Sequence, residues 1–128
     1  PGLNFAPAAA IRDGITVDYR FFGTGPGTAA NTNGRTATHE IGHWMNLRHI
    51  WGDATCGNDL VSDTPTHNAA NSGVPAVGHR STCSGTPLEM YMNYMDYTDD
   101  RGMYMFSKGQ ASRMAAVFGS TGPRASFR

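Results

Sequence analysis

Residues 39–49 read HEIGHWMNLRH and contain three of the chain's five histidines together with one glutamate. Residues four apart share one face of a helix, so His39 and His43 can direct their rings at one point. Glu40 would then lie beside a bound metal, within reach of a water molecule at an open coordination position. Zinc lowers the pKa of such a water towards ~7 and the glutamate can take its proton. This spacing therefore predicts a hydrolytic zinc centre.

The third metal ligand requires the helix to end. His49 lies six residues after His43, which does not match the same helical face. Asn46 stands where the chain must turn, and asparagine tolerates the left-handed conformation better than most residues other than glycine. We therefore predict His39, His43 and His49 as zinc ligands and Glu40 as the general base. The alternative is an HExxH pattern that arose by chance on an amphipathic helix, with solvated or packed histidines.

Three segments of regular structure are predicted around this motif. Residues 15–22, ITVDYRFF, are rich in β-branched and aromatic residues and are bounded by glycine, which predicts a strand. Residues 36–47 are expected to form the metal-binding helix, capped by Thr36 or a nearby asparagine. Residues 107–118 are expected to form a second helix with Ser107 as its cap.

The stretch 52–86 has little periodicity and many turn-forming residues. A segment of this length without regular structure is uncommon in a compact domain unless a disulfide, a metal or a function ties it down. Cys56 and Cys83 do not form a CxxC pair, and a disulfide between them is the simplest interpretation. Such a bond would place the chain outside the reducing cytosol. Two buried free thiols are the alternative.

The composition limits the domain count and the partners. A chain of 128 residues suits one domain, 1–128. Ten basic and ten acidic residues give zero formal net charge without a Lys/Arg run, which argues against nucleic acid or an anionic membrane as partner. No apolar run approaches the ~20 residues of a membrane span.

HEIGHWMNLRH resembles HExxHxxGxxH, the long zinc motif of the metzincin metalloproteases, with Asn46 where most members have glycine. Together with CGNDLVSDTP, MNYMDYTDD and MFSKGQASRM, it resembles the pappalysin (cytophagalysin-like, M43-type) branch. The resemblance implies an α+β zincin catalytic domain, represented mainly by its lower subdomain with an edge strand and the active-site helix. Only 38 residues precede His39, so much of the upper subdomain is expected to be missing.

The resemblance also assigns roles to single residues. It implies that Met95, in NYMDY, is the methionine of the Met-turn and forms an apolar floor below the histidines rather than a ligand. It implies that Tyr97 stabilises the tetrahedral intermediate, with simple packing as the alternative. Asp59, Asp63 and Thr64 match a loop that binds calcium in some members, and their oxygen atoms suit that ion. Ordinary turn residues are the alternative there.

The implied protein is a secreted zinc endopeptidase that acts as a monomer on protein or peptide substrates. An extended substrate could pair with the edge of 15–22. One alternative is a catalytically impaired zinc-binding remnant or binding module without a complete cleft, and another is a zinc hydrolase of non-peptide amides. Relatives often have a second disulfide, whose positions correspond to Val74 and Gly102 here. Both cysteines are absent together, which supports pairing Cys56 with Cys83.

Overall fold

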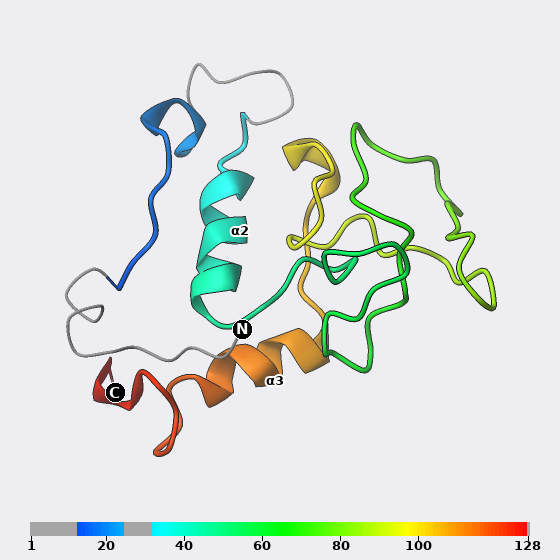
Figure 1. The fold of residues 1–128 in the computed structure, drawn as a ribbon. Helices are drawn as coiled ribbons and strands as arrows, with labels where there is room; N and C mark the ends of the chain where they lie inside the picture. Colours follow the sequence, from blue (N-terminus) through cyan, green and yellow to red (C-terminus); the bar gives the residue numbers. More distant parts are fainter. Residues whose placement is uncertain (1–12, 25–31, 128) are drawn as a thin grey trace.

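The computed structural model describes residues 13–24 and 32–127. In Figure 1, α3 runs across the lower end of α2, and the long segment between them winds beside α2, on the side opposite residues 13–24. The described residues form two α-helices and three short 3₁₀ helices: η1 (Tyr19–Phe21), α2 (Arg35–Trp44), η2 (Asp100–Gly102), α3 (Lys108–Ala116) and η3 (Ala125–Phe127).

The helix predicted at 36–47 is α2, which begins one residue earlier and ends at Trp44. The predicted cap is wrong, because the N-cap is Gly34, in the left-handed conformation at φ 73°. Glycine has no side chain that could accept a hydrogen bond from the first N–H groups of the helix. The first N–H groups of a helix still need acceptors. Asp100 supplies one: its Oδ2 accepts hydrogen bonds from the N–H of Asn33 at 3.0 Å and of Arg35 at 3.1 Å. A residue of η2 therefore caps α2.

The second predicted helix is confirmed as α3, with Ser107 as its cap. Ser107 Oγ accepts from the N–H of Gln110 at 3.0 Å, and Gln110 Oε1 accepts from the N–H of Ser107 at 2.9 Å, which completes a capping box. Gln110 is fully buried and also exchanges two hydrogen bonds with the side-chain amide of Asn93. The box thus ties α3 to the segment that carries Met95.

The strand predicted at 15–22 is wrong. Asp18 accepts a hydrogen bond from the N–H of Arg20 at 3.0 Å and caps η1, so the local bond replaces an extended conformation. A strand also needs a partner for its backbone groups. The described residues contain only isolated β-bridges, Arg80 with Leu88 and Asn93 with Met105. The α+β class is therefore not confirmed within the part of the chain that the structure describes.

The core lies between the end of α2 and α3. Leu47, Ile50 and Met95 are buried there. Partly buried side chains pack around these three: Trp51, Met90, Phe106 and Met114. A core of this size is small, so the long middle segment depends on further ties.

One of those ties is the disulfide between Cys56 and Cys83, which is confirmed, so the free-thiol alternative is wrong. Val74 and Gly102, the positions that correspond to a second disulfide in relatives, also lie next to each other, as expected. A Cβ atom on Gly102 would lie 3.1 Å from Val74 Cγ2, and the N–H of Asp99 donates to the carbonyl of Gly73. The same two loops are therefore joined here by packing and one backbone hydrogen bond.

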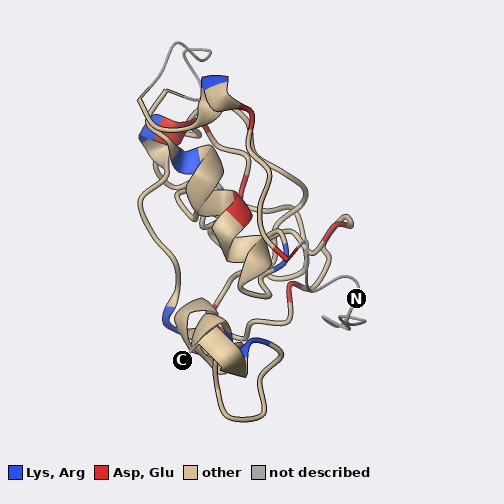
Figure 2. Ribbon diagram, turned by 90° about the vertical axis from the view of Figure 1, so that its left-hand side faces the viewer, with Lys and Arg blue, Asp and Glu red and all other residues tan. Residues whose placement is uncertain are grey.

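Lys and Arg residues are scattered along the described chain and do not gather into one basic run (Figure 2). Several of them form ion pairs with nearby acids: Arg20 with Asp18, Arg101 with Asp99, and Arg124 with Asp13. Among the described residues, no helix is both long enough and apolar enough to cross a membrane.

Candidate metal centre

The turn after α2 brings the third histidine back to the first two. Asn46 adopts the left-handed conformation at φ 72°, as predicted, and the N–H of Leu47 donates to the carbonyl of Gly42 at 2.9 Å. Arg113 of α3 donates from Nε to the carbonyl of Asn46 at 2.7 Å. This bond satisfies a carbonyl at the helix end and holds the turn against α3.

The predicted ligands converge on one point. His43 Nε2 lies 3.0 Å from His39 Nε2 and 3.1 Å from His49 Nε2. Zinc–nitrogen bonds of about 2.1 Å in a tetrahedral shell would place ligand nitrogens roughly 3.4 Å apart. The three imidazoles are therefore spaced almost as a zinc ion requires.

Hydrogen bonds at the far side of each ring set the tautomer. Each Nδ1 faces an oxygen that can only accept: the carbonyl of Tyr94 at 2.7 Å for His39, the carbonyl of Leu47 at 3.0 Å for His43, and the carboxylate of Asp53 for His49. The ring protons therefore sit on Nδ1, and each Nε2 presents a lone pair. Burial lowers the pKa of His39 to about 4, with the neighbouring His43 adding to the shift. Three Nε2 lone pairs that face one another suit a bound cation.

Glu40 lies at the edge of the histidine cluster and is partly exposed. It lines a cavity of about 180 Å³ together with His39 and Tyr97. It also lines a second cavity of about 330 Å³, together with His43 and the segment 13–16. A carboxylate in this position can reach a water molecule or a substrate group beside the three Nε2 atoms.

Tyr97 lies over the same histidines. Its ring centroid is 5.5 Å from that of His39 and 5.0 Å from that of His49. Burial raises the pKa of its phenol, and the carboxylates of Asp53 and Glu40 raise it further, so the hydroxyl stays protonated at neutral pH. The residue is 55% exposed, so a substrate could reach the phenol.

Met95 lies beneath α2 and is fully buried. A Cβ atom on Gly42 would lie 2.4 Å from Met95 Sδ, so glycine at this position leaves room for the methionine. The carbonyl of Met95 accepts from the N–H of Ile50 at 3.0 Å, next to the third histidine. This placement agrees with the expected apolar floor.

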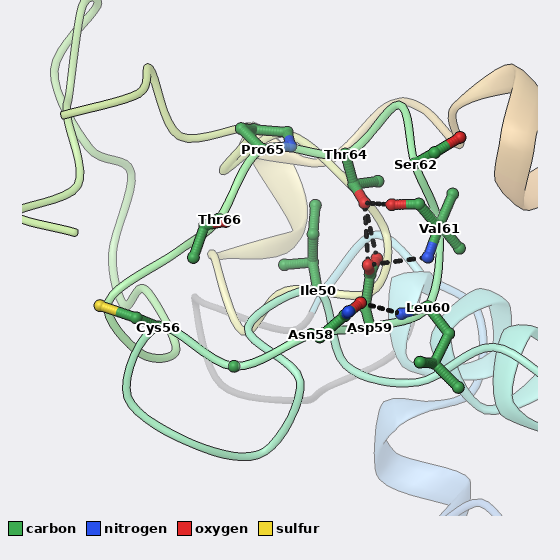
Figure 3. A pocket seen from close by; sticks show the side chains of 11 residues that line it. Ile50, Cys56, Asn58, Asp59, Leu60, Val61, Ser62, Thr64, Pro65 and Thr66 are labelled. Carbon is green, nitrogen blue, oxygen red and sulfur yellow. Dashed lines mark hydrogen bonds between the residues drawn. The ribbon is translucent and has the colours of Figure 1, made fainter. Parts of the chain in front are cut away.

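The three residues expected to bind calcium do not form one cluster, because Asp59 and Thr64 contact each other whereas Asp63 lies elsewhere. Thr64 Oγ1 donates to the buried Asp59 carboxylate, 2.9 Å from both of its oxygens, and both residues line a cavity of about 480 Å³ (Figure 3). Burial raises the pKa of Asp59. Asp63 lies at the start of α3 instead, where its carboxylate accepts from Ser107 Oγ at 2.7 Å and from the N–H of Gly109 at 2.8 Å.

A buried polar cluster around His67 is not predicted by the sequence analysis above. His67 Nε2 accepts from the N–H of Met90, and its Nδ1 lies 3.5 Å from Asp96 and 3.7 Å from Glu89. Asn71 donates to both carboxylates. These residues follow no motif spacing, so only the fold reveals the cluster. Asp96 also accepts from the N–H of Tyr97 at 2.8 Å and so supports the backbone of that tyrosine.

Comparison with known families decides the classification. Residues 5–119 match the peptidase family M43, described as pregnancy-associated plasma protein-A. The chain belongs to this family. The resemblance to the pappalysin branch is therefore confirmed.

Curated relatives of this M43 chain include fungal proteins. It is 42% identical over 118 residues to extracellular metalloprotease 1 of Coccidioides posadasii (strain C735), an alignment that covers 90% of this chain and 42% of the relative. It is 43% identical over 114 residues to an extracellular metalloprotease of Podospora anserina, covering 88% of this chain and 38% of the relative. The chain thus spans about two-fifths of the length of these relatives.

Solved structures of mirolysin share the fold. A complex of mirolysin with compound 9 superposes with a TM-score of 0.85 at 43% identity, over 92% of this chain and 46% of the mirolysin chain. Mature mirolysin of Tannerella forsythia with a cleaved peptide superposes with a TM-score of 0.81 at 43% identity, over 88% of this chain and 44% of that one. The described fold therefore corresponds to nearly half of a mirolysin chain.

Proposed function

We propose that residues 1–128 are the zinc-binding part of the single catalytic domain of a metzincin-type zinc metalloendopeptidase. The observation that carries this proposal is the convergence of three Nε2 lone pairs beside the carboxylate of Glu40. We assign the lower subdomain and the active-site helix of an α+β zincin to this chain. The likeness to mirolysin supports that assignment.

His39, His43 and His49 would hold the zinc ion, which when bound supplies a Lewis acid for peptide hydrolysis. Glu40 takes the proton of the attacking water and returns it to the departing amine, as a general base and then a general acid. Tyr97 donates its phenolic hydrogen bond to the oxyanion that develops on the substrate carbonyl. One donor of this kind contributes on the order of 3 kcal/mol to transition-state stability.

We propose protein or peptide substrates bound in extended form. The cavities on either side of Glu40 offer space for substrate groups near the reacting bond. The relatives named extracellular metalloproteases and the Cys56–Cys83 disulfide support secretion. We further propose that the chain acts as a monomer.

The second candidate is a zinc-binding remnant or binding module without a complete cleft. One observation favours it: residues 15–22 lack the predicted strand at which an extended substrate could pair. Both candidates require zinc, and only the endopeptidase cleaves an unfolded protein.

Casein cleavage with matched variants separates the two candidates. Glu40→Gln is expected to keep stoichiometric zinc and lose activity by about 10²–10⁴-fold. Asp18→Asn makes the same carboxylate-to-amide change at an exposed residue that lines neither cavity, and it is expected to retain activity. Stoichiometric zinc with no cleavage by the unaltered chain would favour the remnant, and zinc affinity undiminished in His49→Ala would overturn the ligand assignment.

We also propose a calcium site that uses Asp59 and Thr64. Carboxylate and hydroxyl oxygens suit Ca²⁺, and the cavity beside them is large enough for further oxygen ligands. In this arrangement Asp63 supports α3 and contributes to the site only indirectly. Calcium should raise the melting temperature of the chain and of Asp63→Asn, but not of Asp59→Asn. A calcium response in Asp59→Asn equal to that of the unaltered chain would contradict the assignment.

A further inference from the structure

The third histidine differs from the other two in what holds it. His39 and His43 donate from Nδ1 to backbone carbonyls, whereas His49 donates to the side chain of Asp53. A hydrogen bond to a carboxylate is roughly twice as strong as one to a neutral acceptor. The electron-donating strength of His49 therefore depends on a side chain that a single substitution can change.

The turn after His49 is built to return Asp53 to that ring. The N–H of Gly52 donates to the carbonyl of His49 at 2.9 Å, and Gly52 and Asp53 have φ angles of 66° and 59°. A Cβ atom on Gly52 would lie 2.3 Å from the backbone nitrogen of Asn58, so the turn is packed tightly against the following loop. A left-handed conformation costs a residue with a side chain about 1 kcal/mol or more, and the surrounding structure must enforce it.

The ring of His49 is also held on one face. Trp51 stacks on it with centroids 4.3 Å apart and an interplanar angle of 6°. The stack fixes the plane of the imidazole, while the hydrogen bond from Nδ1 fixes its rotation in that plane. Together they direct Nε2 at His43 Nε2, 3.1 Å away.

We propose that Asp53 is a positioning residue for the zinc site, which holds His49 in the Nδ1–H tautomer and strengthens Nε2 as a ligand. The inference rests on the proposed zinc centre. Carboxylates that hydrogen-bond to zinc-ligating histidines typically change metal affinity by about 10–100-fold when they are removed. The same effect is expected here.

A plain surface ion pair is the competing explanation, since 60% of the Asp53 side chain is exposed. Exposed pairs contribute little to folding stability. The two explanations differ in the property that changes. A positioning residue alters zinc affinity and ligand geometry without altering the stability of the metal-free protein, whereas a surface pair alters neither by much.

The test compares Asp53→Asn, Asp53→Gly and Asp18→Asn in the full chain. Asparagine tolerates the left-handed conformation and keeps an acceptor without the charge, and glycine relieves the backbone while removing the side chain. Asp18 is an exposed, ion-paired carboxylate in another part of the chain, so it serves as the control. Zinc dissociation constants are measured by competition with a chromophoric chelator, and metal-free stability by circular dichroism.

We expect the dissociation constant to rise at least about 10-fold in Asp53→Gly and by a smaller factor in Asp53→Asn, with the control unchanged. The visible spectrum of the cobalt-loaded Asp53→Gly protein should also differ from that of the unaltered chain. Affinities within twofold in both variants would overturn the role of Asp53 while leaving the zinc site intact. Undiminished affinity in His49→Ala would overturn the zinc site itself and this inference with it.

Discussion

Replacing Gly42 with alanine tests the packing between α2 and the segment beneath it that carries Met95. The added Cβ atom would lie 2.4 Å from Met95 Sδ and 3.4 Å from Phe106 Cε1. Non-bonded heavy atoms normally lie about 3.5–4.0 Å apart, so the sulfur must retreat by roughly 1 Å. Met95 is fully buried against Leu47 and Ile50, and a close-packed core offers little free space for that movement.

Two opposing effects determine how far the free energy of unfolding changes in Gly42→Ala. Alanine stabilises a helix interior by about 0.8–1 kcal/mol relative to glycine. Overpacking a core costs about 1–3 kcal/mol. Because Met95 is fully buried in a close-packed core, we expect the packing cost to win and the free energy of unfolding to fall by about 1–2 kcal/mol. Displacing Met95 should also shift the neighbouring carbonyl of Tyr94 away from His39 Nδ1 and weaken zinc binding.

Urea unfolding of the metal-free protein measures the stability change, with Gly14→Ala as the control. A Cβ atom on Gly14 would meet nothing within 4 Å, so that variant should match the unaltered chain. Adding Met95→Ala to Gly42→Ala removes the clashing atom, so the double variant should lose at least ~0.5 kcal/mol less than the sum of the two single changes. If Gly42→Ala proves as stable as the unaltered chain, or more stable, the packing argument is wrong.

Further predictions concern the turn, the loops and the buried acid. Asn46→Gly should leave the free energy of unfolding unchanged or raise it slightly, whereas Asn46→Ala should lower it by about 1 kcal/mol, because φ is 72° at this position; equal effects in urea unfolding would contradict this. The double variant Val74→Cys/Gly102→Cys should form a second disulfide and add roughly 3–4 kcal/mol through loop entropy. Mass spectrometry and unfolding with and without reductant check this, and persistent free thiols would refute it. Burial raises the pKa of Asp96, but the close contact with His67 and the hydrogen bonds from Asn71 outweigh it and lower the pKa overall. A carboxyl whose folded pKa is lowered stabilises the fold above its unfolded value of about 4, and that contribution is lost as the pH falls through the folded value. Asp96→Asn should therefore flatten the acid dependence of stability below about pH 5, and an unchanged slope in acid unfolding followed by circular dichroism would count against this.

The proposed metal ligands illustrate what can be predicted from local spacing. His39 and His43 share a helical face because they are four residues apart, and the position of Asn46 indicates where the helix must turn. The cap of α3 was likewise predictable, because Ser107 and Gln110 form their box within four consecutive residues. Interactions of this kind depend on backbone geometry that the sequence encodes directly.

Other structural features could not be predicted, because they depend on contacts between residues that are far apart in the sequence. The strand at 15–22 was predicted from composition, but a strand requires a neighbour that composition does not supply. Asp100 caps α2 from another segment, and Asp63 supports α3 across a similar distance. No local pattern distinguishes these acids from ordinary turn residues.

The sequence by itself determined the chemistry of this chain, namely three histidines and a glutamate at the offsets of a metallopeptidase motif. Only the tertiary structure decided which oxygen each histidine faces, and therefore that all three Nε2 lone pairs point at one another. It also decided that Asp53 holds His49, through two successive left-handed residues. The physical reason is that helical spacing is set by neighbouring residues, whereas a hydrogen-bond acceptor is chosen by whatever the completed fold places within reach.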